Sequence, residues 1–425
     1  MAPPEVRFPA ARSAIGGVPI ADLVAAFGTP TYVYDAARIE AQIDRFKAFD
    51  TVRYAQKANS NLAILDLVRR KGVLVDAVSA GEIHRAELAG YSASGKPAPI
   101  VFTADIFDRD SLEMVLDRGV AVNCGSPDMI DQYGERVPGG EITLRINPGF
   151  GHGHSRKTNT GGEHSKHGIW HADLEDAVML ADKHGLRVTG IHMHIGSGVD
   201  FEHLAKVSAA AVGFARRVGS SVRTLSAGGG LPTPYREEDP EVDIDAYFAI
   251  WDRDRKALEE TFGHAVELEI EPGRFLTAEA GSLLTEIRAT KEMGSNTFYL
   301  VDAGFNNLAR PILYGSHHPI SLALDAEEAA KRSLRKVVVG GPLCESGDIF
   351  TQDEGGIVRS EPVLEARVGE ILTIECAGAY GFVMSSNYNS KPFAAEVLVR
   401  DGSAHLVRRR ETVEDLVRGE SIPEA

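Results

Sequence analysis

Residues 52–78 read VRYAQKANSNLAILDLVRRKGVLVDAV. This stretch opens on a short β-type run, continues through an amphipathic segment at residues 61–72 and closes on a second β-type run. Apolar residues of the middle segment recur at helical spacing, and Gly72 stands where glycine commonly ends a helix. A strand, a helix and a further strand in this order predict parallel strands in one sheet.

The same alternation continues along the chain as far as residue 271. Amphipathic stretches separate eight β-type runs, which are VRYA (52–55), VLVDAV (73–78), PIVFTA (99–104), VAVNC (120–124), ITLRIN (142–147), VTGIHMHI (188–195), VRTLSA (222–227) and VELEIE (266–271). Eight strand-helix units are the number found in a closed (β/α)8 barrel of the TIM type. An open doubly wound sheet would show a similar alternation and stays open as an alternative.

Beyond Glu271 the pattern changes to β-type runs separated by turns, with few long helices. Such a pattern is typical of a mostly antiparallel β domain. We therefore expect an α/β barrel domain at residues 35–280 and a β-rich domain made of residues 1–34 and 281–425. The first residues precede the first barrel strand, so we expect them to pack on the β-rich domain.

The composition argues against some classes of binding partner. The 425 residues carry a formal net charge of −16, and the longest basic run is Arg408 to Arg410. These features argue against a nucleic-acid or anionic-membrane partner and leave small molecules as expected substrates. Every apolar run falls short of the about 20 residues that span a bilayer, and the opening residues do not resemble a signal peptide. The expected location is the cytoplasm.

Chemically active side chains follow the predicted barrel strands. In such barrels the active site is built from the loops at the carboxyl ends of the strands. The residues found there are Lys57, Asp76, Arg145, His192, His194, Gly228 to Gly230 and Glu271. If the barrel is closed, all of them lie around one opening.

Lys57 stands in the motif YAQKANSN, between the first strand and a helix that Asn59 or Ser60 could cap. A single lysine is most often a solvated surface residue. At a barrel opening, however, partial burial lowers the pKa of an amine and allows it to form a Schiff base with a carbonyl compound.

Gly228, Gly229 and Gly230 leave backbone N–H groups unobstructed by side chains, which suits a phosphate. Glycine clusters are often simple turns, but barrel phosphate sites are frequently made by the loops after strands seven and eight. The eighth loop adds Glu271 and Arg274 across a Pro-Gly turn. Glu271 could pair with Arg274, or it could keep the pyridine nitrogen of a bound cofactor protonated.

His192 and His194 alternate along one strand and should point to the same side. Such a pair could bind a metal, as in a metal-dependent hydrolase. We expect no metal, because no acidic and histidine grouping is evident at the other strand ends and a metal would leave Lys57 unused. The polar stretch 147–168, with further histidines at 152, 154, 164 and 167, is expected to form a mobile loop over the opening.

The three cysteines, Cys124, Cys344 and Cys376, are too scattered for a disulfide framework and should be thiols. Cys344 begins the motif CESGD after a strand-like run, and the polar residues that follow it favour a loop. A thiol has an ordinary pKa of about 8.5 and is mostly protonated near neutral pH, so Cys344 could donate a proton.

Taken together, these motifs resemble those of the diaminopimelate decarboxylases, which are fold-type III pyridoxal 5'-phosphate (PLP) enzymes. The resemblance covers nearly the whole chain, and its motifs are YAQKAN, VDAVSAGEI, LRINPGFGHGHSRKTNTGG, SKHGIW, GIHMHIGSGVD, SAGGGL, EIEPGRF, VDAGFNNLARPILYGS, GPLCESGDIF and AGAYGFVMSSNYNS. So many stretches in one order are far more specific than any single motif.

The resemblance implies a PLP site. Lys57 would hold the cofactor covalently, His194 would stack on its ring, and Glu271 would face its pyridine nitrogen. The other implied cofactor contacts are Asp76, Ser197, Gly228, Gly229, Gly230, Gly273, Arg274 and Tyr380. Most of these would surround the phosphate.

The implied reaction is the decarboxylation of meso-2,6-diaminopimelate to L-lysine and CO2, the last step of lysine biosynthesis. Cys344 would be the proton donor, and the implied substrate contacts are Arg274, Arg310, Tyr314, Glu345 and Tyr380. In the family the residues matching Cys344 and Glu345 reach the site of the other subunit, which implies a homodimer. The β-rich domain would thus contribute Cys344 and Tyr380 to the active site.

Three related functions stay open. A decarboxylase of another diamino acid or of a carboxylated polyamine would use the same core residues. A PLP racemase would need a base on the opposite face of the ring, whereas Cys344 suits protonation from one direction. A PLP-binding protein without catalytic activity would not need Cys344.

Overall fold

The computed structural model describes residues 6–151, 161–194 and 201–424, and the chain divides into two compact units. The barrel unit comprises Glu40–Thr233 and Pro240–Phe275, and the β-rich unit comprises Met1–Ile39, Pro234–Asp239 and Leu276–Ala425. The sequence did not indicate that Pro234–Asp239 joins the β-rich unit.

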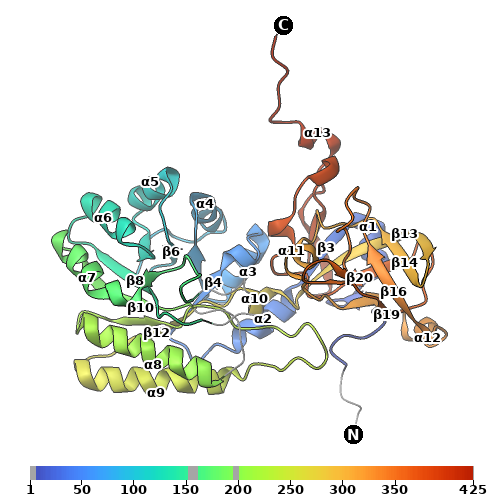
Figure 1. Cartoon of the computed structure of the whole chain (residues 1–425). Coiled ribbons are helices and arrows are strands. Elements are labelled where there is room, and N and C mark those ends of the chain that lie inside the picture. Colours follow the sequence, from blue (N-terminus) through green and yellow to red (C-terminus); the bar gives the residue numbers. More distant parts are fainter. Residues whose placement is uncertain (1–5, 152–160, 195–200, 425) are drawn as a thin grey trace. The chain divides into compact units, whose positions relative to one another are not determined.

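The barrel unit is a closed barrel of eight parallel strands (Figure 1). The strands are β4 (Thr51–Ala55), β5 (Leu74–Ala77), β6 (Ile100–Ala104), β7 (Ala121–Cys124), β8 (Glu141–Asn147), β10 (Arg187–His192), β11 (Thr224–Ser226) and β12 (Glu267–Ile270). Each strand pairs with the next, and β12 pairs with β4 through Glu269 and Thr51. This last pairing closes the sheet, so the predicted barrel is confirmed and the open sheet is wrong.

Helices connect the strands, as the alternation predicted. They are α3 (Leu62–Arg70), α4 (Ala80–Leu88), α5 (Arg109–Arg118), α6 (Pro127–Arg136), α7 (Leu174–Lys183), α8 (Phe201–Val218) and α9 (Ile244–Phe262). The helix α2 (Ala36–Asp44) precedes β4, and the short α10 (Arg274–Thr277) follows β12. A two-residue strand, β9 (Ile169–Trp170), pairs with the end of β8. The helices α6 and α9 begin at the side-chain caps Ser126 and Asp243.

A buried salt bridge joins the strands at the closure of the barrel. Arg53 on β4 donates from Nη2 to Oε1 of Glu269 on β12 at 2.8 Å and from Nε to Oε2 at 3.1 Å. Both side chains are almost completely buried. Burial alone would lower the pKa of Arg53, but the adjacent Glu269 carboxylate raises it above its ordinary value. The pair is therefore charged on both sides and satisfied by two hydrogen bonds.

Replacing Arg53 with alanine should destabilise the barrel unit by about 3–5 kcal/mol, because it leaves the Glu269 carboxylate buried without its cation. Urea unfolding followed by tryptophan fluorescence measures this loss, since Trp170 and Trp251 both lie in the barrel unit. The double variant Arg53→Met/Glu269→Leu should recover much of the stability. If Arg53→Ala unfolds at the wild-type urea concentration, the pair does not stabilise the closure.

The β-rich unit is built on the long strand β13 (Gly281–Met293), whose neighbours are β3 (Thr31–Asp35), β14 (Asn296–Val301) and β20 (Ile371–Ile374). The outer strands are β15 (Ile320–Leu322), β16 (Leu334–Gly340), β19 (Glu361–Leu364), β21 (Ala395–Arg400) and β22 (Ser403–Arg408). Only the β3–β21 and β14–β16 pairings of this sheet are parallel among the described residues. The expected mostly antiparallel fold is confirmed.

The N-terminal segment belongs to this unit. β1 (Ala14–Ile15), β2 (Val18–Pro19) and α1 (Ile20–Phe27) precede β3. Ile20 and Leu23 of α1 pack with Val33, Leu284 and Val397 in one hydrophobic cluster. The shorter elements of the unit are α11 (Arg310–Tyr314), α12 (Ala326–Ala329), α13 (Val413–Leu416), β17 (Gln352–Asp353) and β18 (Ile357–Val358). In the described part of the chain, every helix is too short or too polar to cross a membrane.

Candidate active site

The carboxyl ends of the barrel strands carry the residues that the sequence placed there. Lys57 lies in the 3-10 turn Gln56–Ala58 directly after β4 and is half-buried. Asp76 is the third residue of β5, and Glu271 follows β12. His192 ends β10, and His194 follows two residues later.

Local contacts hold the turn that carries Lys57. The N–H of Ala55 donates to the carbonyl of Pro272 at 3.2 Å. This hydrogen bond joins the carboxyl end of β4 to the segment that follows β12. A Cβ on Gly273 would lie 3.0 Å from the Ala55 oxygen, so glycine permits this close approach. The cap of α3 is Asn61, whose Oδ1 accepts from the N–H of Ala63. The expected caps Asn59 and Ser60 are therefore wrong by one or two residues.

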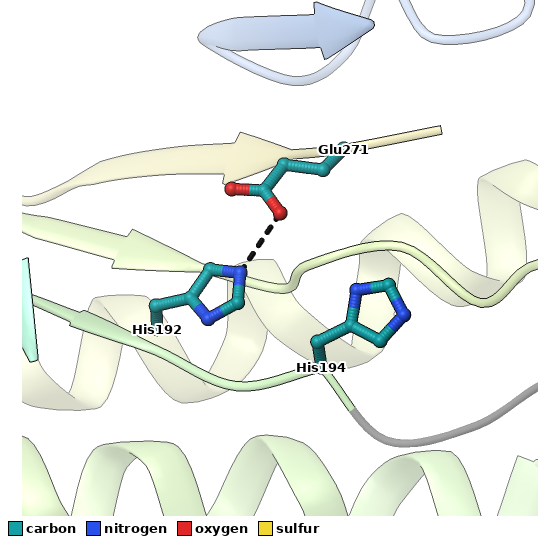
Figure 2. A group of neighbouring side chains, drawn as sticks. All are labelled: His192, His194 and Glu271. Atoms are coloured by element: carbon teal, nitrogen blue, oxygen red, sulfur yellow. Dashed lines mark hydrogen bonds and ion pairs between the residues drawn. The ribbon is translucent and has the colours of Figure 1, made fainter. Parts of the chain in front are cut away.

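His192, His194 and Glu271 form a compact group (Figure 2). Nε2 of His192 donates to Oε2 of Glu271 at 2.8 Å, and the hydroxyl of Ser226 lies 3.4 Å from Oε1. The two imidazole rings are stacked with centroids 6.4 Å apart, as expected for alternate residues on one face. The N–H of Gly229 donates to Nδ1 of His194 at 3.0 Å, so the proton of a neutral His194 is on Nε2.

The two buried carboxyl groups of the opening have opposite pKa shifts. Burial alone would raise the pKa of Glu271, but the charge and hydrogen bond of His192, together with Arg53, lower it to about 2. Burial and the negative Glu271 raise the pKa of Asp76 well above its ordinary value, although Lys57 opposes this. Glu271 is thus the ionised carboxylate of the site, and its charge favours a proton on Asp76.

Burial, followed by the positive charges of Lys57 and Arg145, lowers the pKa of His194 well below its ordinary value. His194 is therefore neutral near neutral pH. A neutral imidazole is suited to stacking on a flat ring without adding a further charge to the opening.

The glycine loop is packed more closely than the sequence indicated. Gly228 has a φ of +61°, and a Cβ there would lie 2.3 Å from the Met193 oxygen. The N–H of Gly228 donates to the Ser226 hydroxyl and that of Gly229 to His194. The expectation of three unobstructed N–H groups is thus wrong for these two glycines. In the described part of the chain, the N–H of Gly230 meets no acceptor.

The distances within the histidine pair and Glu271 also suit a metal ion, since one ligand atom of each residue lies within 4.8 Å of the others. The expectation that no acidic and histidine grouping occurs at the other strand ends is therefore wrong, because folding brings Glu271 to His192. Two of the three groups are already hydrogen-bonded to each other, and Nδ1 of His194 accepts from Gly229. A metal ion bound through Nε2 of His192 or Nδ1 of His194 would have to replace these hydrogen bonds.

Two side chains hold the described ends of the 147–168 loop. Asn147 accepts from the N–H groups of Gly149 and Gly162. Asp105, after β6, accepts from the N–H of Gly168 at 2.8 Å and contacts Nδ1 of His167 at 2.6 Å. Although Asp105 is partly buried, these bonds lower its pKa. The predicted loop histidines at 152 and 154, and the predicted phosphate contact Ser197, lie outside the described residues.

The β-rich unit carries the thiol. Cys344 is exposed in a loop after β16, whereas Cys124 and Cys376 are buried and burial raises the pKa of both. The carboxylate of Asp348 accepts from the N–H of Leu343 at 2.8 Å, which shapes the loop. Oδ1 of Asn389 accepts from the N–H of Cys344, also at 2.8 Å. The sequence analysis did not assign a role to Asn389.

The other predicted substrate residues occupy several elements. Arg310 and Tyr314 begin and end α11 of the β-rich unit, where Arg310 is buried and Tyr314 half-buried. Glu345 is exposed beside Cys344, and Tyr380 has a φ of +56°. Arg274 lies in the barrel unit at the start of α10. The structure therefore places Lys57, Asp76, His194, Glu271 and the glycine loop in the barrel unit, and Tyr380, Cys344 and Arg310 in the β-rich unit.

Comparison with known proteins agrees with this arrangement. Residues 36–278 match the family model described as pyridoxal-dependent decarboxylase, pyridoxal binding domain. The chain is 55% identical over 423 residues to the diaminopimelate decarboxylase of Streptomyces coelicolor, covering 99% of this chain and 96% of that protein. It is 52% identical to the diaminopimelate decarboxylase of Escherichia coli K12, covering 93% and 94% of the two chains.

Solved structures of diaminopimelate decarboxylases have the same fold. A crystal structure of diaminopimelate decarboxylase superimposes with a TM-score of 0.90 at 51% identity, covering 94% of this chain and 95% of the other. The enzyme from Helicobacter pylori complexed with L-lysine gives a TM-score of 0.83 at 29% identity, covering 94% and 98%. The fold and site thus define a pyridoxal-dependent decarboxylase. Within that class, the chain belongs to the diaminopimelate decarboxylase family.

Proposed function

We propose that the protein decarboxylates meso-2,6-diaminopimelate to L-lysine and CO2, the last step of lysine biosynthesis, with PLP as its cofactor. The observation that carries this proposal is the grouping of Lys57, Asp76, His194 and Glu271 at the carboxyl ends of the barrel strands. The similarity to diaminopimelate decarboxylases over nearly the whole chain supports it.

The chemistry of the opening fits PLP. Oδ1 of Asp76 is buried and meets no hydrogen-bond partner among the described residues, which is consistent with a polar ligand beside it. The backbone of the glycine loop leaves no space for side chains at Gly228 and Gly229. A negative Glu271 and a neutral His194 match the charge of a protonated pyridine ring and the need for stacking.

Each predicted cofactor residue would then have its own role. The amine of Lys57 would bind the cofactor aldehyde, Glu271 would hold the proton on the pyridine nitrogen, and His194 would lie against the ring. The phosphate contacts would be Ser197, Gly228, Gly229, Gly230, Gly273 and Arg274, with Asp76 and Tyr380 completing the site. When bound, PLP withdraws electrons from the substrate carbon that loses CO2.

The substrate is held by the remaining predicted residues. Arg274, Arg310 and Tyr314 would bind the carboxylate far from the reacting carbon, and Glu345 would bind the distal ammonium, with Tyr380 nearby. Bidentate arginine pairing suits a carboxylate. Lysine and ornithine lack this second carboxylate and would leave an arginine without its partner, so they should be poor substrates.

Cys344 would donate the proton that replaces CO2 on the substrate carbon. It is the exposed thiol of the chain. Following the family resemblance, we propose that Cys344 and Glu345 enter the site of the other subunit in a cytoplasmic homodimer. The net charge of −16 argues against nucleic acid or an anionic membrane as further partners.

Incubating the purified protein with PLP and one candidate substrate at a time tests the proposed function. We expect CO2 and lysine from meso-diaminopimelate, and little product from ornithine, arginine, lysine or carboxynorspermidine. Preference for one of the latter would identify a related decarboxylase instead. The absence of CO2 from all of them would reject the proposal.

Replacing Glu271 with glutamine should lower kcat by about 10²–10³, because an amide supplies no charge to hold the ring proton. The pKa of Glu271 is about 2, below its ordinary value. Its contribution to stability is therefore complete above the ordinary carboxyl pKa of about 4.3 and is lost as pH falls towards 2. From pH 5 to 9 Glu271 stays ionised, so the ratio of wild-type to variant kcat should not vary with pH.

A matched control for this variant lies on the same strand. Glu267→Gln changes an exposed carboxylate of β12 and should leave kcat unchanged. If Glu271→Gln retains wild-type kcat, Glu271 does not control the charge of the ring.

A further inference from the structure

Arg145 is a buried cation at the barrel opening that the proposed function does not use. It lies in β8, two residues before the end of the strand, and is only 7% exposed. Among the described residues, its guanidinium meets no carboxylate within ion-pair distance and no hydrogen-bond acceptor. Burying a charge without a partner costs free energy, because the charge loses its hydration. An anionic ligand that binds beside Arg145 would remove this cost.

The register of the sheet shows where Arg145 points. Arg145 on β8 lies directly opposite His192 on β10, and opposite residues of paired strands point to the same face of the sheet. The side chain of His192 reaches Glu271 past the intervening strand β11 (Figure 2). The side chain of Arg145 therefore lies on the same face as the histidine and the carboxylate of the site.

The carboxylate that Arg145 influences has other partners. Burial alone would raise the pKa of Asp105, but the hydrogen bond of His167 and then the charge of Arg145 lower it. Oδ1 of Asp105 accepts from the N–H of Gly168 at 2.8 Å, and Oδ2 lies 2.6 Å from Nδ1 of His167. Asp105 is thus held by the segment before β9 and forms no ion pair with Arg145.

The order of the strands separates two edges of the opening. β10, which leads to His194, has β11 on one side and β8 on the other. The loop after β11 is the glycine loop proposed to bind the phosphate, and the N–H of Gly229 donates to Nδ1 of His194. A ring that lies on His194 with its phosphate at this loop therefore turns its opposite edge towards β8 and Arg145. In PLP that edge carries the ring oxygen, because the oxygen and the phosphate arm flank the aldehyde carbon on opposite sides.

We propose that Arg145 binds the ionised ring oxygen of PLP, next to the aldehyde that binds Lys57; this assignment rests on the cofactor proposed above. The guanidinium donates hydrogen bonds to this oxygen and supplies the positive charge that favours its ionised form. Glu271 supplies the negative charge at the pyridine nitrogen. Arg145 and Glu271 thereby hold two different positions of the ring with opposite charges, and this fixes the orientation of the ring over His194.

Cofactor binding to the apoprotein tests this assignment without turnover. Arg145→Met keeps most of the aliphatic side chain and removes the charge. It should raise the Kd for PLP, measured by equilibrium dialysis, by about 10–100-fold, because a hydrogen bond between charged groups is lost. Arg145→Lys keeps the charge without the planar guanidinium and should stay within about tenfold of the wild-type Kd.

A cofactor analogue identifies the atom that Arg145 binds. 3-Deoxypyridoxal 5'-phosphate lacks the ring oxygen but keeps the aldehyde and the phosphate. We expect the wild type to bind it about 10–100-fold more weakly than PLP. In Arg145→Met the ratio of the two Kd values should be smaller by about tenfold, since the partner of the oxygen is already absent. If Arg145→Met weakens both ligands equally, Arg145 acts on the phosphate or on another group, and the assignment is wrong.

A control and a stability measurement accompany these variants. Arg187→Met removes an exposed arginine that pairs with Glu141 at the other ends of β10 and β8, and it should leave both Kd values unchanged. Because methionine replaces a buried charge that has no partner, the apoprotein of Arg145→Met should unfold at the wild-type urea concentration or above it. Unfolding at a clearly lower urea concentration would show that Arg145 has a structural partner and would overturn the proposal.

The proposal is also overturned if folded Arg145→Met binds PLP as tightly as the wild type, or if its ratio of Kd values equals that of the wild type. Should Arg145→Met fail to fold, the ratio measured for Arg145→Ala decides in the same way. A wild type that does not bind PLP would instead reject the proposed cofactor, and with it the role of Arg145. The failure of the assignment and the failure of the proposed function are therefore distinguishable.

Discussion

Lys57→Ala should lower kcat for diaminopimelate decarboxylation by at least about a thousandfold, as for other residues that form the covalent bond of a reaction. The amine lies at the exit of β4, in a turn that the Ala55 and Pro272 hydrogen bond holds against the exit of β12. Alanine removes the group that would bind the cofactor aldehyde and leaves this turn intact. The measurement is lysine release, together with the visible absorption of bound cofactor, which should change in the variant.

Lys183→Ala is the control for this experiment. Lys183 is an exposed residue at the end of α7 that pairs with Asp131 on the barrel exterior, so its loss should not change kcat. Wild-type turnover by Lys57→Ala, or a bound-cofactor spectrum identical to that of the wild type, would remove Lys57 from the mechanism.

The barrel could be predicted because its information is local. Each of the eight strands is a short apolar run, and each observed strand begins within two residues of the start of the run that predicted it. The carboxyl ends of parallel strands share one end of a barrel. Placing Lys57, His194 and Glu271 after strands therefore sufficed to predict that they meet.

Other parts of the site depend on contacts that no local pattern encodes. The side chain of Asn389 accepts from the N–H of Cys344, 45 positions away, and Arg310 hydrogen-bonds to Tyr235, 75 positions earlier in the chain. The hydrogen bond between His192 and Glu271, which lie 79 positions apart, was not predicted either, although both residues were placed at the same opening. The only signals in the sequence were the alternation of His192 with His194 and the position of Glu271 after another strand.

Two barrel helices are marked in the sequence more by their caps than by an apolar face. α6 is mostly polar, and its start is indicated by Ser126 followed by proline, a pattern that sequence reasoning could have used. α9 begins at the Asp243 cap and ends at Gly263, but charged residues interrupt its apolar face. In both helices the caps were a clearer signal than the hydrophobic period.

The charge distribution of the opening links fold to chemistry. Arg53 on β4 helps to keep Glu271 ionised, and Glu271 in turn raises the pKa of Asp76. A barrel core made only of apolar side chains would not shift the pKa values of these two carboxyl groups in opposite directions. The buried pair of Arg53 and Glu269 therefore has two consequences, for stability at the closure and for the ionisation of a residue at the opening.

Cys344→Ala should lower kcat by about 10²–10⁴, the usual effect of removing a general acid. The exposure of Cys344 and Glu345 within one chain is consistent with their use by a second subunit. If the site is shared, a dimer of one Lys57→Ala chain and one Cys344→Ala chain has one site with both groups intact and one site lacking both. Each variant alone forms only defective sites.

Mixing the two inactive variants, followed by subunit exchange, should therefore restore activity. Random reassortment makes half of the dimers mixed, and half of their sites are intact, so about one quarter of wild-type activity is expected. Exchange is verified separately with differently tagged chains, and a mixture of Lys57→Ala with a Lys57→Ala/Cys344→Ala double variant is the control that should stay inactive. Proven exchange without recovery would place Lys57 and Cys344 of one site on the same chain, because only then does every mixed dimer contain two defective sites.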